Sequence, residues 1–223
     1  AGDNPRVRAL VDRAKAAGIP VQHAKAATLD KQTGGETHQG IVAEFRPIEP
    51  MSEAELDTLI EARGGELLLL ALDQVQDPHN LGACLRSAAA AGVDAVLVPR
   101  DRSAPLSPAA RRAAAGAAEV VPLVEVANLA RSLEHIKQAG VWAVGLAGEA
   151  GTTLYDIDLT GARVVVMGSE ESGLRRLTAE RCDELAKIPM ASTMESLNVS
   201  VATGIALFEA VRQRGDRSTA RSK

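Results

Sequence analysis

From Gly65 onward the sequence alternates short apolar segments with helical segments, and this alternation constrains the fold more than any other feature. Five segments are predicted to be buried strands: ELLLLALDQV, DAVLVP, VWAVGLAG, RVVVMGSE and LAKIPM, at residues 66–75, 94–99, 141–148, 163–170 and 185–190. Continuous apolar strands separated by helices are typical of a parallel sheet covered on both faces. We therefore predict an α/β fold that binds its ligand at the carboxyl ends of the strands.

Helix signals lie between these strands. The segment DPHNLGACLRSAAAAG has Asp77 or Asn80 as its N-cap and Gly92 as its stop, and further helices are predicted over 107–116 and 128–140. The last helix lies within MESLNVSVATGIALFEAVRQR, where Ile205, Phe208 and Val211 recur at helical spacing. Its first turns are unusual, because four polar residues interrupt an otherwise apolar stretch: Ser196, Asn198, Ser200 and Thr203.

Residues 1–46 have a different pattern and are predicted to form a small α/β domain. A helix over 5–17 is followed by two predicted short strands, at 18–24 and 38–45. Because the segment opens in a helix with no leading strand, we expect the beginning of this domain to be missing from the sequence. Residues 47–64 are predicted to be a linker and a helix that a Ser52–Glu55 capping box opens. The main domain is predicted over 65–215, with a basic tail over 216–223.

Composition narrows the function classes. Aromatic residues make up only 2% of the chain, which favours tight helix-on-sheet packing over a site of stacked rings. The two cysteines and four histidines are scattered, so neither a disulfide framework nor a metal site is predicted. No signal peptide or membrane-spanning run is recognised, and a cytoplasmic protein is expected. The net charge is −4, yet residues 1–31, 100–112 and 211–223 are locally basic and suited to phosphates.

The glycines argue against a polyphosphate nucleotide. The first strand is followed by LDQVQDPHNLG, which lacks the dinucleotide-binding glycine pattern. In GSEESG, Leu174 and Arg175 stand where a P-loop needs Lys and Ser or Thr, and two glutamates would repel phosphates. A cofactor without phosphates, including a cationic one, fits better. Three strand ends near Gly148, Gly168 and Met190 predict a pocket at one sheet edge, where glycines let a ligand approach the backbone.

Three segments carry a resemblance to a known family. NLGACLRSA (80–88), VVVMGSEESGL (164–174) and IPMASTMESLNVSVATGIALFEAVRQR (188–214) resemble, in order and spacing, the signature motifs of the SpoU/TrmH class of RNA 2′-O-methyltransferases. QDPHNLGA and THQGI also resemble segments of that family. The chain is most similar to the bacterial subgroup that methylates a guanosine ribose of 23S ribosomal RNA.

This resemblance implies a fold, a cofactor and partners. It implies a parallel sheet with a deep trefoil knot at its C-terminal part, S-adenosylmethionine bound in the knot, a homodimer, and an RNA-binding role for residues 1–46. No metal and no membrane is expected among the partners, in line with the composition. The residues that would form the cofactor pocket are Gly148, Gly168, Ile188, Met190 and Leu197.

The resemblance also implies catalytic residues. Arg86 matches the residue that activates the ribose hydroxyl, although a guanidinium that stays protonated is equally suited to gripping the adjoining phosphate. Asn80 would fix the loop that places Arg86, Glu170 would hold Arg86 or the ribose, and Asn198 would bond to the substrate or to Glu170. Ser196 would face the ligand; without the motif it would be an N-cap.

Three other functions are also compatible with the sequence. One is an RNA-binding module that keeps the knot but lacks turnover, and another is a methyltransferase of the same class with a different rRNA or tRNA ribose as target. The third is a protein resembling a nucleotide-binding dehydrogenase, which would bind NAD and not S-adenosylmethionine.

Overall fold

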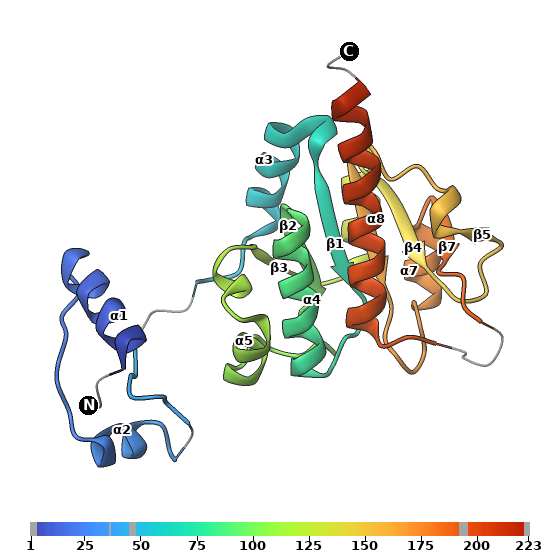
Figure 1. Ribbon diagram of the computed structural model, residues 1–223. Coiled ribbons are helices and arrows are strands. Elements are labelled where there is room, and N and C mark those ends of the chain that lie inside the picture. The colour runs from blue at the N-terminus through green and yellow to red at the C-terminus, as the bar shows by residue number, and fades with distance from the viewer. Residues whose placement is uncertain (1–3, 36, 45–47, 192–195, 221–223) are drawn as a thin grey trace. The chain divides into compact units, whose positions relative to one another are not determined.

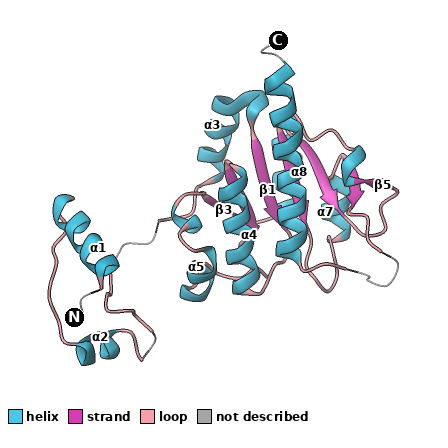
Figure 2. Ribbon diagram, in the orientation of Figure 1, coloured by secondary structure: helices cyan, strands magenta, loops and turns pink. Residues whose placement is uncertain are grey.

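The computed structural model describes residues 4–35, 37–44, 48–191 and 196–220. Within the chain two compact units are distinct, residues 1–48 and residues 49–223. Figure 1 shows the course of the chain through the helices and strands of both units, and Figure 2 marks the regular elements against the loops.

The N-terminal unit contains two helices, α1 (Pro5–Ala16) and α2 (Ala26–Gln32). Asn4 caps α1, because its side-chain oxygen accepts a hydrogen bond from the Arg6 amide at 3.0 Å. The His38 ring joins the end of α2 to the following turn, with Nε2 3.2 Å from an Asp30 oxygen and Nδ1 accepting from the Gly40 amide.

The two strands predicted in this unit are wrong for the residues that the structure describes. Residues 18–24 and the described part of 38–45 form no β-ladder. Gln39 and Gly40 adopt positive φ angles, +52° and +87°, which turn the chain. Ile19 is 58% exposed. A segment becomes a strand only when a neighbour pairs with its backbone, and local sequence cannot supply that neighbour.

The C-terminal unit is built on a seven-stranded sheet with the order β3-β2-β1-β6-β4-β7-β5. Every strand pair in it is parallel. The strands are β1 (Leu68–Leu72), β2 (Ala95–Pro99), β3 (Leu123–Val126), β4 (Trp142–Leu146), β5 (Thr152–Thr153), β6 (Arg163–Met167) and β7 (Glu184–Lys187). The predicted α/β class and parallel sheet are confirmed; β3 and β5 were not predicted from the sequence.

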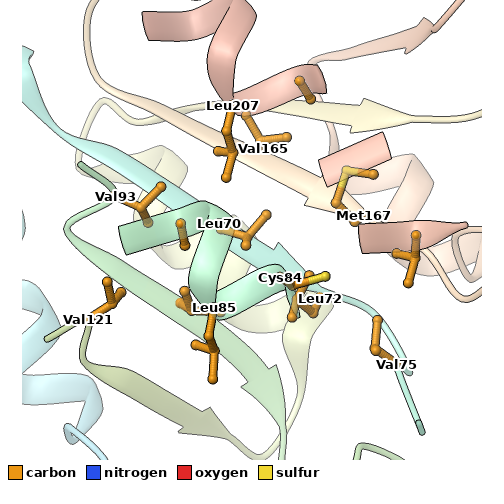
Figure 3. Close-up of a cluster of buried hydrophobic side chains, with 14 of the residues drawn as sticks. Leu70, Leu72, Val75, Cys84, Leu85, Val93, Val121, Val165, Met167 and Leu207 are labelled. Atoms are coloured by element: carbon orange, nitrogen blue, oxygen red, sulfur yellow. The ribbon is translucent and has the colours of Figure 1, made fainter. Parts of the chain in front are cut away.

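Helices cover both faces of this sheet. They are α3 (Glu53–Arg63), α4 (Pro78–Ala91), α5 (Pro108–Ala114), α6 (Leu129–Gln138), α7 (Arg176–Arg181) and α8 (Val199–Ala220), with short 3-10 turns at Gly64–Glu66, Ala117–Glu119 and Leu154–Asp156. Side chains of β1 alternate between two hydrophobic clusters. Leu70 belongs to the cluster under α4, α5 and α8, and Leu69 to the cluster under α3 and α6. Figure 3 shows the first cluster, where Leu85 of α4 and Leu207 of α8 approach the sheet.

Helix ends follow the chemistry of the sequence. The Ser52–Glu55 capping box is confirmed, with both of its hydrogen bonds formed. Asp77 is the N-cap of α4, since its Oδ1 accepts from the His79 amide at 2.9 Å. Because Asp77 caps the helix, the side chain of Asn80 is available for other contacts. Gly92 ends the helix in the left-handed conformation, as predicted.

The glycine of the NLG segment has a packing role. A methyl group on Gly82 would lie 2.3 Å from the carbonyl oxygen of Ala110 and 2.5 Å from the Cβ of Ala113. Both belong to α5, so only glycine lets α5 pack this closely on α4.

The predicted apolar face of the last helix needs correction. Between residues 199 and 215 of α8, Thr203, Ala206, Leu207 and Ala210 are fully buried, whereas Phe208 is 50% exposed. Val201, seven residues earlier, is equally exposed. Helical spacing predicted an apolar stripe at Phe208 correctly, but this stripe lies outside the core of the chain.

The C-terminal part of α8 is attached to the segment before β6. Gln213 accepts a hydrogen bond from the Leu159 amide at 2.8 Å and donates one to the Ile157 carbonyl at 3.0 Å. Arg214 donates to the Gly161 carbonyl at 2.7 Å. The trefoil knot stays a prediction. No helix in the part of the chain that the structure describes is long and apolar enough to cross a membrane.

Candidate functional site

The sheet order brings the carboxyl ends of β6, β4 and β7 next to one another, and a cavity of about 320 Å³ opens there. We call it the first cavity. Five of its lining residues are those predicted to hold a cofactor: Gly148, Gly168, Ile188, Met190 and Leu197. Ser196 and Glu170 also line it. Segments far apart in the sequence therefore meet in one place, at the sheet edge where the strand ends predicted a pocket.

The walls of the first cavity combine apolar and charged side chains. Leu146, Met167, Ile188 and Leu197 supply apolar surface, and Glu149, Glu170 and Lys187 supply charge. Apolar walls with convergent polar groups are common features of small-molecule sites, and the first cavity combines the two.

The two predicted glycines serve different purposes. A methyl group on Gly168 would lie 2.1 Å from the carbonyl carbon of Gly173 and 2.3 Å from the amide nitrogen of Leu174. Gly168 lines the first cavity, but the loop itself fills the space beside its Cα, so the loop's own packing requires glycine at this position. Ser169 and Gly173 close this loop with two reciprocal backbone hydrogen bonds. A methyl group on Gly148, by contrast, would meet nothing within 4 Å.

Asn198 connects the three sequence motifs. Its Nδ2 donates to Asn80 Oδ1 at 3.0 Å and to Glu170 Oε1 at 2.5 Å. The Val199 amide also donates to Glu170 Oε1, at 3.3 Å. We call Asn80, Glu170 and Asn198 the Asn198 junction. The predicted bond between Asn198 and Glu170 is present, and it ties the start of α4, the loop after β6 and the start of α8 together.

The polar start of α8 has two explanations. Asn198 is its N-cap, because Oδ1 accepts from the Ser200 amide at 2.9 Å and from the Ser200 hydroxyl at 2.6 Å. Ser196 precedes the cap and lines the first cavity. Thr203 is fully buried, and its hydroxyl donates to the Val199 carbonyl at 2.7 Å. Of these polar residues, only Ser196 lines the first cavity, and α8 itself contributes Val199 and Ala202 to the lining.

Cys84 lies close to the start of α8, but its thiol is unreactive. Its Sγ is 3.5 Å from the Thr203 hydroxyl. Burial raises the pKa of the Cys84 thiol to about 11, so it stays protonated near neutral pH. A neutral thiol is a poor nucleophile, and a covalent cysteine mechanism is disfavoured. Within the described ranges, no cluster of three or more His, Cys, Asp or Glu residues could hold a metal ion.

Arg86, which was predicted to be a catalytic residue, does not lie at the site in this structure. It lies exposed on α4 and lines neither the first cavity nor a second one described below. It forms no hydrogen bond or ion pair with Glu170. Six residues separate it from Asn80, which places it on another side of the same helix.

Sequence reasoning missed a buried ion pair that supports the loop after β6. Asp73 follows β1 and is 0% exposed. Its Oδ1 accepts from Nε and Nη2 of Arg175, each at 2.6 Å, and its Oδ2 accepts from the Arg175 amide at 3.0 Å. The Asp73 amide in turn donates to the Met167 carbonyl at 2.7 Å. An aspartate at the end of an apolar strand was the one sequence signal for this ion pair. Its partner could not be identified, because the sequence does not tell which strand lies beside β1.

A second cavity of about 350 Å³ adjoins the first. The turn that follows β1, residues 74–77, forms one wall, and the loop after β6 forms the other. Asn80 and Glu170 of the Asn198 junction also line it. Because Glu170 lines both cavities, it lies where they meet.

Comparison with known proteins matches both parts of the chain to family models. Residues 67–208 match the SpoU rRNA methylase family, and residues 1–51 match an RNA 2′-O ribose methyltransferase substrate-binding family. A protein from Pasteurella multocida named 23S rRNA (guanosine-2′-O-)-methyltransferase RlmB is 55% identical over 213 residues, which cover 95% of this chain and 86% of that protein.

Solved structures are similar as well. An rRNA methyltransferase from Sinorhizobium meliloti has a TM-score of 0.77 and 30% identity, covering 93% of this chain and 77% of that one. The AdoMet-bound form of the Sinorhizobium meliloti enzyme has a TM-score of 0.70 and 28% identity, with the same coverage.

The ion pair leads to a stability prediction. Arg175→Gln leaves the buried Asp73 carboxylate without its counter-ion and should lower the free energy of unfolding by about 3 kcal/mol, the low end for a broken buried pair. The low end applies because the Arg175 side chain is 39% exposed. Urea unfolding measures the loss, and hydrogen exchange should report faster exchange at the Ser169 and Gly173 amides.

The neighbouring residue supplies the control. Arg176 pairs with Glu180 on the surface, and Arg176→Gln should change the free energy of unfolding by less than about 1 kcal/mol. Equal effects of the two substitutions would show that the ion pair of Asp73 does not hold the loop.

Proposed function

The chain belongs to the SpoU rRNA methylase family, and from this membership we propose that it methylates the 2′-hydroxyl of a guanosine in 23S ribosomal RNA, with S-adenosylmethionine as methyl donor. One observation carries the proposal: the Asn198 junction joins all three motif segments at the mouth of a cavity formed by strand ends. We further propose that it acts in the cytoplasm and that residues 1–46, which are basic at their start, bind the RNA.

The lining of the first cavity suits the chemical groups of S-adenosylmethionine. Ile188 and Leu197 offer apolar walls for an adenine ring, and the open space at Gly148 lets a ligand lie against the backbone. Lys187 suits the carboxylate of the amino-acid part, and Glu149 suits its ammonium group. Bound there, S-adenosylmethionine supplies an electrophilic methyl group on a sulfonium.

We assign Glu170 to the ribose of the target nucleotide. The Asn198 side chain and the Val199 amide fix its Oε1, while Oε2 has no hydrogen-bond partner among the residues that the structure describes. A carboxylate held in this way accepts a hydrogen bond from the ribose hydroxyl and draws its proton away from the attacking oxygen. Most of the rate gain then comes from orienting the hydroxyl.

We assign Arg86 to the phosphate that adjoins the target ribose. A guanidinium stays protonated in almost any protein environment, so it is a poor general base. Its planar fork binds phosphate oxygens in pairs and thereby orients the sugar. Its exposure on α4 leaves it accessible to RNA.

We also propose a homodimer formed through α8. Val201 and Phe208 are each 50% exposed on one side of this helix, and α4 with Arg86 lies beside it (Figure 1). Covering this stripe with the same stripe of a second copy would bury apolar surface and bring Arg86 close to the contact. That position accounts for an arginine that stands apart from both cavities of the single chain.

Sedimentation measures the proposed dimer. The chain should sediment at twice its 23.3 kDa mass at micromolar concentration, and Phe208→Glu should shift it to the monomer, because a charge would be buried in the contact. Leu177→Glu, at a 52% exposed leucine of α7, should leave the mass unchanged. A wild-type chain that sediments only as a monomer would contradict the dimer.

Gly148 provides a test of the cofactor site that does not disturb the protein. Gly148→Val adds a side chain into open space and should weaken S-adenosylmethionine binding at least about tenfold, with an unchanged melting temperature. Gly151→Val is the control, because that glycine is equally unhindered but does not line the first cavity. Calorimetry gives both affinities, and equal affinities for the two variants would exclude Gly148 from the site. NAD should not bind.

Arg86 provides a test that separates catalysis from cofactor binding. Arg86→Ala should leave S-adenosylmethionine affinity within a few-fold but reduce methyl transfer to a 23S rRNA fragment by at least about a hundredfold, since an orienting group is lost. Arg86→Lys should resemble alanine if both phosphate oxygens must be gripped, and should recover activity if charge suffices. Single-turnover transfer at saturating cofactor measures both. Near-normal transfer by the alanine variant would remove Arg86 from the site.

A further inference from the structure

The second cavity adjoins the cavity proposed for the methyl donor and is large enough for a ligand of its own. Its volume of about 350 Å³ lies within the range of small-molecule sites, about 300–1,000 Å³. It meets the first cavity at Glu170, the residue assigned to the target ribose. A group attached to that ribose would therefore extend into the second cavity while the ribose hydroxyl faces the first.

The walls of the second cavity select the chemistry of that group. Three carboxylates line it, from Asp77, Glu170 and Glu171, and no lysine or arginine is among its lining residues within the described chain. Such walls repel phosphates and attract hydrogen-bond donors. Glu171 has no hydrogen bond or ion pair with any described residue, and Asp77 uses only Oδ1, in capping α4. Both carboxylates are free to accept.

Asn80 adds an observation that is independent of the acidic residues. Its side chain lines the second cavity and is only 9% exposed. Oδ1 accepts from Asn198, whereas Nδ2 has no partner among the residues that the structure describes. Nδ2 is not among the buried polar atoms that lack a partner, so it reaches the surface of the cavity and is available there to donate to an acceptor on a ligand. The ligand therefore combines donors for the carboxylates with an acceptor for Asn80.

We propose that the second cavity binds the guanine base of the target nucleotide through its Watson–Crick edge, an inference that rests on the proposed function. Guanine is the one RNA base with two adjacent donors on that edge, N1–H and the 2-amino group, and its O6 is an acceptor beside them. Glu171 and Asp77 accept from the two donors, and Asn80 Nδ2 donates to an acceptor of the base. The base leaves its stack to enter, as in other sequence-specific recognition of RNA.

Substitution of single atoms in the RNA tests this assignment. The substrate is the 23S rRNA fragment whose methylated guanosine has been mapped, with that nucleotide replaced by inosine, which lacks the 2-amino group, or by 7-deazaguanosine, which lacks N7 on the opposite edge. For the wild-type chain, kcat/KM should fall about tenfold or more with inosine and stay within about twofold with 7-deazaguanosine. Equal rates with guanosine and inosine would overturn the proposal.

Charge-removing variants connect that preference to the cavity. Asp77→Asn retains an N-cap for α4, because asparagine caps helices as well as aspartate does. The double variant Asp77→Asn with Glu171→Gln should lose more activity on guanosine RNA than on inosine RNA, which offers only N1–H to the carboxylates, so that the ratio of their kcat/KM values falls to within about threefold. Glu180→Gln, an exposed carboxylate of α7 outside both cavities, should keep the wild-type ratio.

Two outcomes separate this inference from the proposed function. If the double variant slows both RNAs equally, the carboxylates do not read the base and the inference is wrong, although the methyltransferase assignment stands. If the wild-type chain binds no S-adenosylmethionine by calorimetry and methylates no rRNA, the proposed function itself fails, and the base assignment fails with it.

Discussion

Parallel pairing of β6 between β1 and β4 is the constraint on which the site depends. The register sets Leu72 of β1 beside Met167 of β6, and Gly145 of β4 beside Val166 of β6. The three strands therefore end at one level, and the loops that leave them share one edge of the sheet. Both cavities lie at this edge, because the loop after β6 forms a wall of each.

Polar contacts then hold these loops in position. The buried Asp73 carboxylate anchors Arg175 at the far end of the loop after β6, and the Asn198 junction anchors the same loop at Glu170. The bond between Asp73 and Arg175 joins residues 102 positions apart, and the bond between Asn80 and Asn198 joins residues 118 positions apart, so both contacts depend on the tertiary fold. The site is thus organised by the folded core beneath it, and its ligands meet groups that are already oriented.

Local patterns predicted the parts of the fold whose causes are local. The Ser52–Glu55 capping box, the stop at Gly92 and the apolar strand around Leu70 all follow from neighbouring residues and were correct. The predicted strand at 18–24 and the described part of the one at 38–45 were wrong, because a strand also requires a partner. The apolar spacing at Phe208 was real, but spacing alone does not tell a core-facing stripe from a stripe on the surface.

The sequence by itself determined the α/β class, the family and the residues of its three motifs, because these depend on local apolar patterns and on the identity and order of side chains. Only the tertiary structure decided how they combine. It assigned Asp77 as the cap and freed Asn80 for the junction, traced the need for Gly168 to the loop's own backbone, and paired Asp73 with Arg175. The physical reason is that strand order is set by pairing between distant segments, and that order determines which loops become neighbours.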